Sequence, residues 1–142
     1  MNQAVIFGPV FAVMALTILV WTYMYVRRIQ FIRANRLGNR DLQAPDALTR
    51  TAPMGVVTPS ANLRNLFELP VILYALALYL HATQKVDATY LAAAWTFTAL
   101  RWLHSLVHCT FNFVPLRFFL YLVASLALWF MVVRAGLDYL AA

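Results

Sequence analysis

Charge is scarce in this sequence of 142 residues, and acidic charge is the scarcest. Only 11% of the residues are charged and only five are Asp or Glu, whereas 63% are hydrophobic. An average soluble domain has roughly 25% charged and about 45–50% apolar residues. A soluble protein of this size could not bury so much apolar side chain. The composition therefore excludes an ordinary soluble domain and indicates a membrane protein.

Cysteine is almost absent, because Cys109 is the only one. An intramolecular disulfide is therefore excluded. Cys109 lies inside an apolar run, which favours a packed residue over a nucleophile. The first apolar run also lacks the basic region and cleavage site of a signal peptide, so we expect it to remain in the mature protein.

Basic residues outnumber acidic ones by eleven to five, and the formal net charge is +6. On a soluble domain this excess would suggest nucleic acid binding. Here the basic residues lie between apolar runs, where they are typical of membrane topology and of contact with anionic headgroups. We therefore expect the lipid bilayer, and no nucleic acid, as a partner.

Four apolar runs predict an all-α membrane protein, a four-transmembrane-helix bundle that forms a single domain over residues 1–142. Each run is long enough to cross about 30 Å of hydrocarbon at 1.5 Å per residue. Thr58-Pro59 predicts the start of the second span, and Pro70 predicts a kink within it. The predicted spans are 5–26, 60–84, 88–110 and 115–139.

The connections differ in positive charge, which predicts the orientation. The long first loop, 29–60, has four arginines and the next connection on that side has Arg117, whereas the turn between the second and third spans has only Lys85. By the positive-inside rule the first loop is cytoplasmic and both termini lie on the other side. We expect a multi-pass integral membrane protein.

The second span begins with polar residues that are costly in a membrane and are therefore functional candidates. Arg64 and Glu68 are four residues apart, and Asn65 is three before Glu68. On a continuous helix all three would share one face.

The third span repeats this pattern, because Arg101, His104 and His108 are spaced by three and four residues. One interpretation is that Glu68 and Arg101 form a buried ion pair that specifies packing. That pair would leave Arg64 and Arg117 without partners. Excess arginine in a partly dehydrated pocket predicts an anionic ligand with carboxylates or an ionisable thiol. A metal site at the two histidines is not expected, since the chain has only three histidines in all.

Three short motifs carry a resemblance to a known family. The stretch Asn62-Leu63-Arg64-Asn65-Leu66-Phe67-Glu68 resembles the Arg-Asn-x-x-Glu signature of the MAPEG proteins, the membrane-associated proteins of eicosanoid and glutathione metabolism. Arg101-x-x-His104-x-x-x-His108 is similar to their Arg-x-x-His-x-x-x-Tyr element, and Pro115-x-Arg117 to the start of their fourth helix. The length, the four spans and the basic first loop agree, and a bacterial-type member in a bacterial inner membrane is expected.

The resemblance implies a homotrimer with glutathione bound as co-substrate between subunits, near the cytoplasmic face. The first-helix arginine of the family aligns with either Arg33 or Arg36. His108 stands where many members have tyrosine. The implied catalytic residues are Arg117 and His108, and the implied glutathione-binding residues are Arg33, Arg36, Arg64, Asn65, Glu68, Arg101 and His104.

A guanidinium in a low-dielectric pocket would favour the thiolate of glutathione, because a free thiol has a pKa near ~8.5. The implied function is a membrane-embedded glutathione-dependent transferase or peroxidase acting on a small lipophilic substrate. One alternative is a non-catalytic member that binds another anionic or lipid ligand, which His108 favours. A small transporter with Glu68 as the coupling carboxylate is the other.

Overall fold

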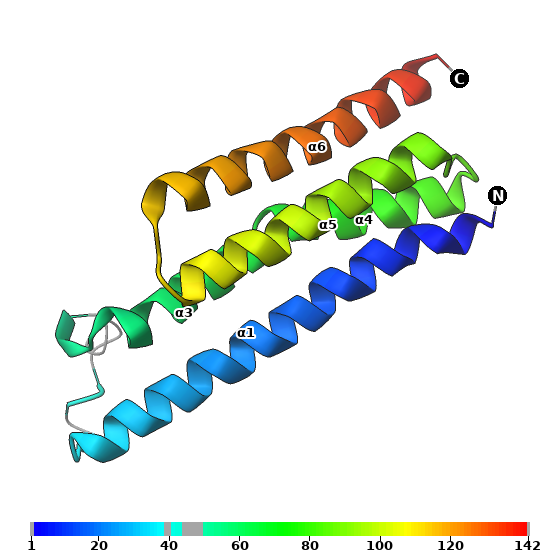
Figure 1. Cartoon of the computed structure of the whole chain (residues 1–142). Helices are drawn as coiled ribbons and strands as arrows, with labels where there is room; N and C mark the ends of the chain where they lie inside the picture. Colours follow the sequence, from blue (N-terminus) through cyan, green and yellow to red (C-terminus); the bar gives the residue numbers. More distant parts are fainter. Residues whose placement is uncertain (1, 39–40, 44–49, 142) are drawn as a thin grey trace.

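The chain is helical throughout the part that its structure, a computed structural model, describes: residues 2–38, 41–43 and 50–141 (Figure 1). Residues 39–40 and 44–49 of the predicted first loop lie outside the described residues. The elements are the short 3₁₀ helix η1 (Gln3–Ile6) and the α-helices α1 (Phe7–Ala34), α3 (Met54–Leu66), α4 (Leu69–Ala82), α5 (Ala88–Cys109) and α6 (Val114–Leu140).

These helices form four rods, because α3 and α4 follow one another along one direction (Figure 1). Three rods are long and apolar enough to cross a membrane: Gln3–Ala34, Met54–Ala82 and Val114–Leu140. The fourth, α5, has 22 residues and spans about 33 Å, but Arg101, His104 and His108 lower its hydropathy. The predicted four-helix membrane bundle is confirmed.

Both termini lie at one end of the bundle, and the connections α1–α3 and α5–α6 lie at the other (Figure 1). Near the termini, the Gln3 amide bonds the backbone of Val86 in both directions: Nε2 donates to its carbonyl oxygen at 3.4 Å, and Oε1 accepts from its nitrogen at 2.8 Å. Helix α5 packs most extensively on α6 and also contacts α1 and α3. The shared end of the termini is confirmed, while the membrane side that it faces stays a prediction.

The second rod begins earlier than predicted, at Met54, so the predicted start at Thr58-Pro59 is wrong. Pro59 lies inside α3, where it has no amide hydrogen to donate to the carbonyl of Gly55 four residues before. Arg27 of α1 supplies the missing donor, because its Nε donates to the Gly55 oxygen at 3.3 Å. A contact from another helix therefore stabilises a proline that sequence reasoning assigned to a helix start.

The predicted kink near Pro70 is a complete break: α3 ends at Leu66 and α4 begins at Leu69. Pro70 cannot donate to the carbonyl of Leu66, and its ring would clash with that carbonyl in a continuous helix. Glu68 lies in the break with φ −97° and ψ −98°. The prediction that Arg64, Asn65 and Glu68 share one continuous helical face is therefore wrong.

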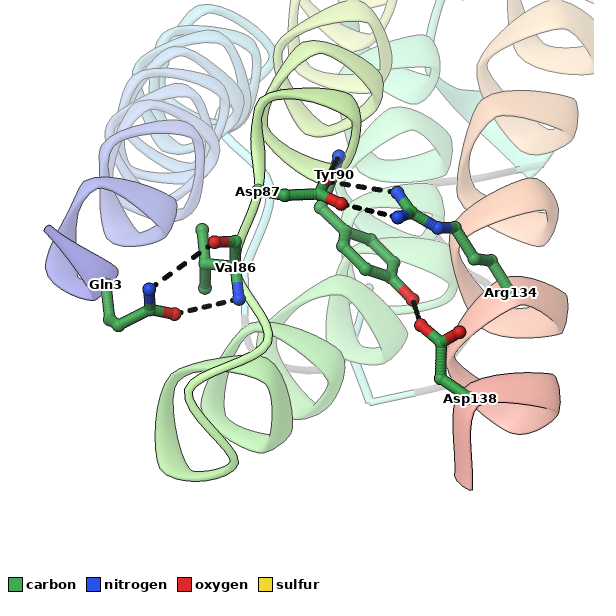
Figure 2. A network of polar contacts seen from close by, with 6 residues as sticks. All are labelled: Gln3, Val86, Asp87, Tyr90, Arg134 and Asp138. Carbon is green, nitrogen blue, oxygen red and sulfur yellow. Dashed lines mark hydrogen bonds and ion pairs between the residues drawn. The ribbon is translucent and has the colours of Figure 1, made fainter. Parts of the chain in front are cut away.

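A polar network holds α5 to α6 at the end where the termini lie (Figure 2). Asp87 caps α5 by accepting from the backbone nitrogen of Tyr90 at 2.9 Å, and it also forms an ion pair with Arg134 of α6. The Tyr90 hydroxyl donates to Asp138 at 2.8 Å, while the Arg134 guanidinium lies 4.2 Å from the Tyr90 ring. This network attaches the C-terminal part of α6 to the start of α5.

The Asp87–Arg134 ion pair predicts a loss of stability in acid. The hydrogen bond from Arg134 holds the pKa of Asp87 below its usual value. A carboxyl whose folded pKa is lowered stabilises the fold above its unfolded pKa of about 3.9, and this contribution disappears as the pH falls through the folded pKa. In detergent, we expect the melting temperature of wild type to exceed that of Asp87→Asn at pH 7, and the two to converge in acid. A difference that stays constant with pH would contradict the assignment.

Candidate functional site

Three polar side chains of α5 are buried on one face of the helix. Arg101, His104 and His108 have exposed fractions of 0%, 2% and 3%. Their spacing of three and four residues places them one above another along α5. The predicted shared face is confirmed. A buried guanidinium is among the least favourable groups in a membrane protein, so its contacts are informative.

Arg101 has fewer partners than its donors require. Its Nη2 donates to the backbone oxygen of Asn65 on α3 at 2.8 Å, and its guanidinium lies 5.2 Å from the centre of the Tyr121 ring on α6. The Nε and Nη1 atoms are buried, and neither has a hydrogen-bond partner among the described residues. Each unmet buried donor costs about 1–3 kcal/mol. Arg101 is therefore a cation with free donor capacity at the centre of three helices.

The hydrogen bond of His104 determines which of its ring nitrogens carries a proton. His104 Nδ1 lies 3.0 Å from the backbone oxygen of Arg117. A carbonyl oxygen only accepts, so Nδ1 is the donor, and Nε2 of the neutral ring is left as an acceptor. Nε2 is buried without a partner in the described structure. His104 thus offers a lone pair beside the Arg101 cation.

His108 extends the cluster by one turn toward the α5–α6 connection. Its ring meets the His104 ring edge-on, with 5.5 Å between the ring centres. Its buried Nδ1 also has no partner among the residues that the structure describes. We call Arg101, His104 and His108 the α5 polar cluster.

Glu68 is exposed and makes no ion pair with Arg101, so the predicted buried pair is wrong. Within the described residues, Asp87–Arg134 is the only ion pair. The Tyr121 hydroxyl instead donates to Glu68 Oε2 at 3.5 Å, and the ring of the same tyrosine lies against Arg101. The break between α3 and α4 gives Glu68 a non-helical backbone and leaves its side chain exposed on the surface of the single chain.

Arg117 and two residues that the sequence reasoning missed complete the site. Asn112 has a left-handed backbone, with φ 48°, in the α5–α6 turn, and its Oδ1 accepts from Arg117 Nη1 at 2.8 Å. Tyr121 lies one helical turn after Arg117, on the same side of α6. That four-residue spacing was the available signal for Tyr121, whereas nothing in the local sequence indicated the Asn112 contact.

The other predicted residues lie elsewhere within one chain. Arg64 is exposed and lines a separate cleft with Arg28 and Ser60, although the backbone of its neighbour Asn65 contacts Arg101. Arg33 occupies the last turn of α1. Arg36 follows that helix with a left-handed backbone, with φ 52°, and both arginines are exposed.

The chemistry that this site offers is anion binding next to a proton acceptor. Two free donors of Arg101 and the Arg117 guanidinium supply positive charge, and His104 Nε2 supplies a basic lone pair. In the described residues no three His, Cys, Asp or Glu side chains gather closely enough to hold a metal ion.

Comparison with known proteins gives one result. The model of the MAPEG family matches residues 6–137, which is nearly the whole chain. A search of curated proteins and a search of solved structures each give no significant match.

Proposed function

Because the chain belongs to the MAPEG family, we propose that it is a membrane-embedded enzyme that uses glutathione, as a transferase or peroxidase acting on lipophilic electrophiles. Family membership supports a glutathione-related membrane function in general, and the specific reaction is our inference. One observation carries the proposal: Arg101 is completely buried and keeps two donors without partners. A buried cation in this state is poised to receive an anion.

Glutathione fits this requirement through its two carboxylates. Carboxylates accept charge-assisted N–H bonds from a guanidinium, and Nε and Nη1 of Arg101, which lie on different edges of the group, are both without a partner among the described residues. Bound in this way, the ligand would neutralise the cation and supply acceptors for these donors. Asn65 and the Tyr121–Glu68 contact would form the wall of the pocket.

Arg117 is the proposed thiolate stabiliser. Its side chain is oriented by Asn112, and its backbone holds the ring of His104. A guanidinium beside the glutathione sulfur favours the thiolate, which is the form that attacks an electrophile or a hydroperoxide. His104 Nε2 is an acceptor for the thiol proton. In this proposal His108 takes the place of the tyrosine of many members and donates a hydrogen bond to the ligand.

The proposed assembly is a homotrimer with the glutathione sites between subunits, in a bacterial inner membrane with the first loop in the cytoplasm. Arg33, Arg36 and Arg64 are exposed in one chain. Their proposed role in glutathione binding therefore requires that a neighbouring subunit presents them to the site. A closed three-fold ring would place each α1 end against the next subunit.

Calorimetry of the purified protein in detergent tests the proposal. We expect glutathione to bind at or below millimolar concentration, with an ultraviolet thiolate band that develops at neutral pH. S-methylglutathione is the matched control, because it keeps the carboxylates but has no ionisable thiol, so it should bind without the band. If neither compound binds at millimolar concentration, the enzyme proposal fails, and a non-catalytic member with another anionic or lipid ligand takes its place.

A further inference from the structure

A second cationic site lies between α1 and α3, apart from the α5 polar cluster. It is a cleft of about 410 Å³ lined by Met24, Arg28, Ser60, Leu63, Arg64 and Phe67. We call it the α1–α3 cleft. Helix α3 separates the two sites, because the Asn65 backbone faces Arg101 while its neighbour Arg64 lines this cleft.

Positive charge in the cleft is not neutralised by the chain itself. Arg28 comes from α1 and Arg64 from α3, and no acidic residue lines the cleft. Among the described residues the only ion pair is Asp87–Arg134, at the opposite end of the bundle. Glu68, the nearest acid along the chain to Arg64, accepts from a tyrosine of α6 instead.

A hydroxyl adds a directed donor to this pair of cations. The Ser60 oxygen is buried at the cleft and has no hydrogen-bond partner within the described structure. Two guanidinium groups and one hydroxyl around a single cavity match a phosphate group, which has several acceptor oxygens and a full negative charge. One arginine reaching from a helix end toward headgroups would be ordinary, whereas two converging from different helices form a site.

The rest of the cleft is apolar, which a soluble phosphate compound would not require. Met24 is buried, Leu63 is half-buried, and the Phe67 side chain is 64% exposed beside the cations. A ligand that contacts both the basic and the apolar residues of the cleft has an anionic head and a hydrocarbon chain.

The depth of the cleft is that of the headgroup region. Trp21 and Tyr23, which are 50% and 39% exposed, precede Arg28 on α1, and such aromatic residues mark a membrane interface. Arg28 is 21 residues after the first residue of α1, or about 30 Å along the helix, close to the thickness of the hydrocarbon core. Lipid phosphates therefore lie at this level whichever way the protein is oriented.

We propose that the α1–α3 cleft binds the headgroup of an anionic membrane phospholipid. Arg28 and Arg64 hold the phosphate oxygens, the Ser60 hydroxyl donates to one of them, and an acyl chain lies along Leu63 and Phe67. Basic pockets between transmembrane helices are suited to anionic headgroups. Arg64 is also among the residues proposed to bind glutathione from a neighbouring subunit, whereas Arg28 and Ser60 belong to this cleft alone, so Arg28→Gln separates the lipid proposal from the glutathione proposal.

Native mass spectrometry of the delipidated protein in detergent provides the test. We expect phosphatidylglycerol to be retained in preference to phosphatidylcholine with the same acyl chains. Arg28→Gln and Arg64→Gln should each weaken phosphatidylglycerol binding about tenfold, because each removes a charge-assisted contact. Arg50→Gln is the matched control. Arg50 is an exposed arginine that lies between α1 and α3 in the chain, and it does not line the cleft. It should bind lipid like wild type.

Three results would overturn the proposal. Equal retention of the two lipids would show that the anionic headgroup is not recognised. Inorganic phosphate or glycerol phosphate competing as well as the intact lipid would show that the chain is not needed, so that the ligand is a soluble phosphate. Displacement of the lipid by glutathione would assign the cleft to the glutathione site. Failure of glutathione to bind anywhere leaves the lipid result unaffected, so the two proposals fail separately.

Discussion

Arg101→Met is expected to abolish glutathione binding while leaving the unliganded protein at least as stable as wild type. The substitution removes both donors that would bind the ligand, and charge-assisted bonds of about 1.5–3 kcal/mol each predict an affinity loss of about 100-fold or more. It also removes a buried cation with two unmet donors and replaces it with an unbranched apolar chain. Replacing incompletely paired buried charges by packed apolar groups is often neutral or stabilising.

Arg134→Met is the matched control for that experiment, because Arg134 is an arginine whose donors are paired with Asp87 at the other end of the bundle. We expect it to lower the melting temperature and to leave glutathione binding unchanged. Thermal unfolding with and without glutathione measures both effects. If Arg101→Met destabilises the unliganded protein as much as Arg134→Met does, Arg101 is a structural residue, and the ligand-binding interpretation of its free donors is wrong.

Arg117→Ala is expected to lower kcat about 100- to 1,000-fold while glutathione still binds. Removal of one preorganised donor to a developing or stable anion typically has an effect of this size. The carboxylate contacts of Arg101 do not depend on the Arg117 side chain, so the dissociation constant should change by less than about tenfold. The thiolate absorbance of the complex should disappear with the activity. Steady-state assays with a chromogenic electrophile and ultraviolet spectra of the complex measure the two quantities.

Asn112→Ala tests whether the orientation of Arg117 matters as well as its charge. It keeps the guanidinium but removes the acceptor that holds Nη1 at 2.8 Å. We expect an intermediate loss of kcat, between wild type and Arg117→Ala, with thiolate absorbance partly retained. Activity of Arg117→Ala within twofold of wild type would assign thiolate stabilisation to another group, and His104 would be the next candidate.

The prolines and the α5 polar cluster show which features could be predicted locally. The periodicity of Arg101, His104 and His108 predicts their common face, because helix geometry alone sets which residues coincide. Pro70 predicts the disruption near Glu68, because a missing amide hydrogen acts within one turn. Pro59 also lacks an amide hydrogen, and by the same local reasoning it predicts a helix start. It lies inside α3 because Arg27 of another helix donates to the carbonyl that Pro59 cannot bond.

The partners of charged groups show the opposite case. Charge alone favoured a Glu68–Arg101 pair, but the break between α3 and α4 leaves Glu68 exposed, and a tyrosine of α6 lies between the two groups. Asn112 and Arg117 meet because of a left-handed turn residue, and Arg28 and Arg64 line one cleft because α1 packs on α3. The spacing of residues along one helix does not predict any of these contacts.

Membrane class, four helical rods and the polar stripe of α5 thus follow from the amino-acid sequence, because hydropathy and helical period are properties of consecutive residues in one segment of chain. Tertiary structure decides which donors stay without partners, and this depends on the three-dimensional positions of groups far apart in the chain. Arg101 and Arg134 are both arginines in apolar helices. Asp87 on a neighbouring helix pairs with Arg134, whereas Arg101 meets one backbone carbonyl and the face of a ring. That difference in partners makes Arg134 a structural contact and Arg101 the centre of the proposed site.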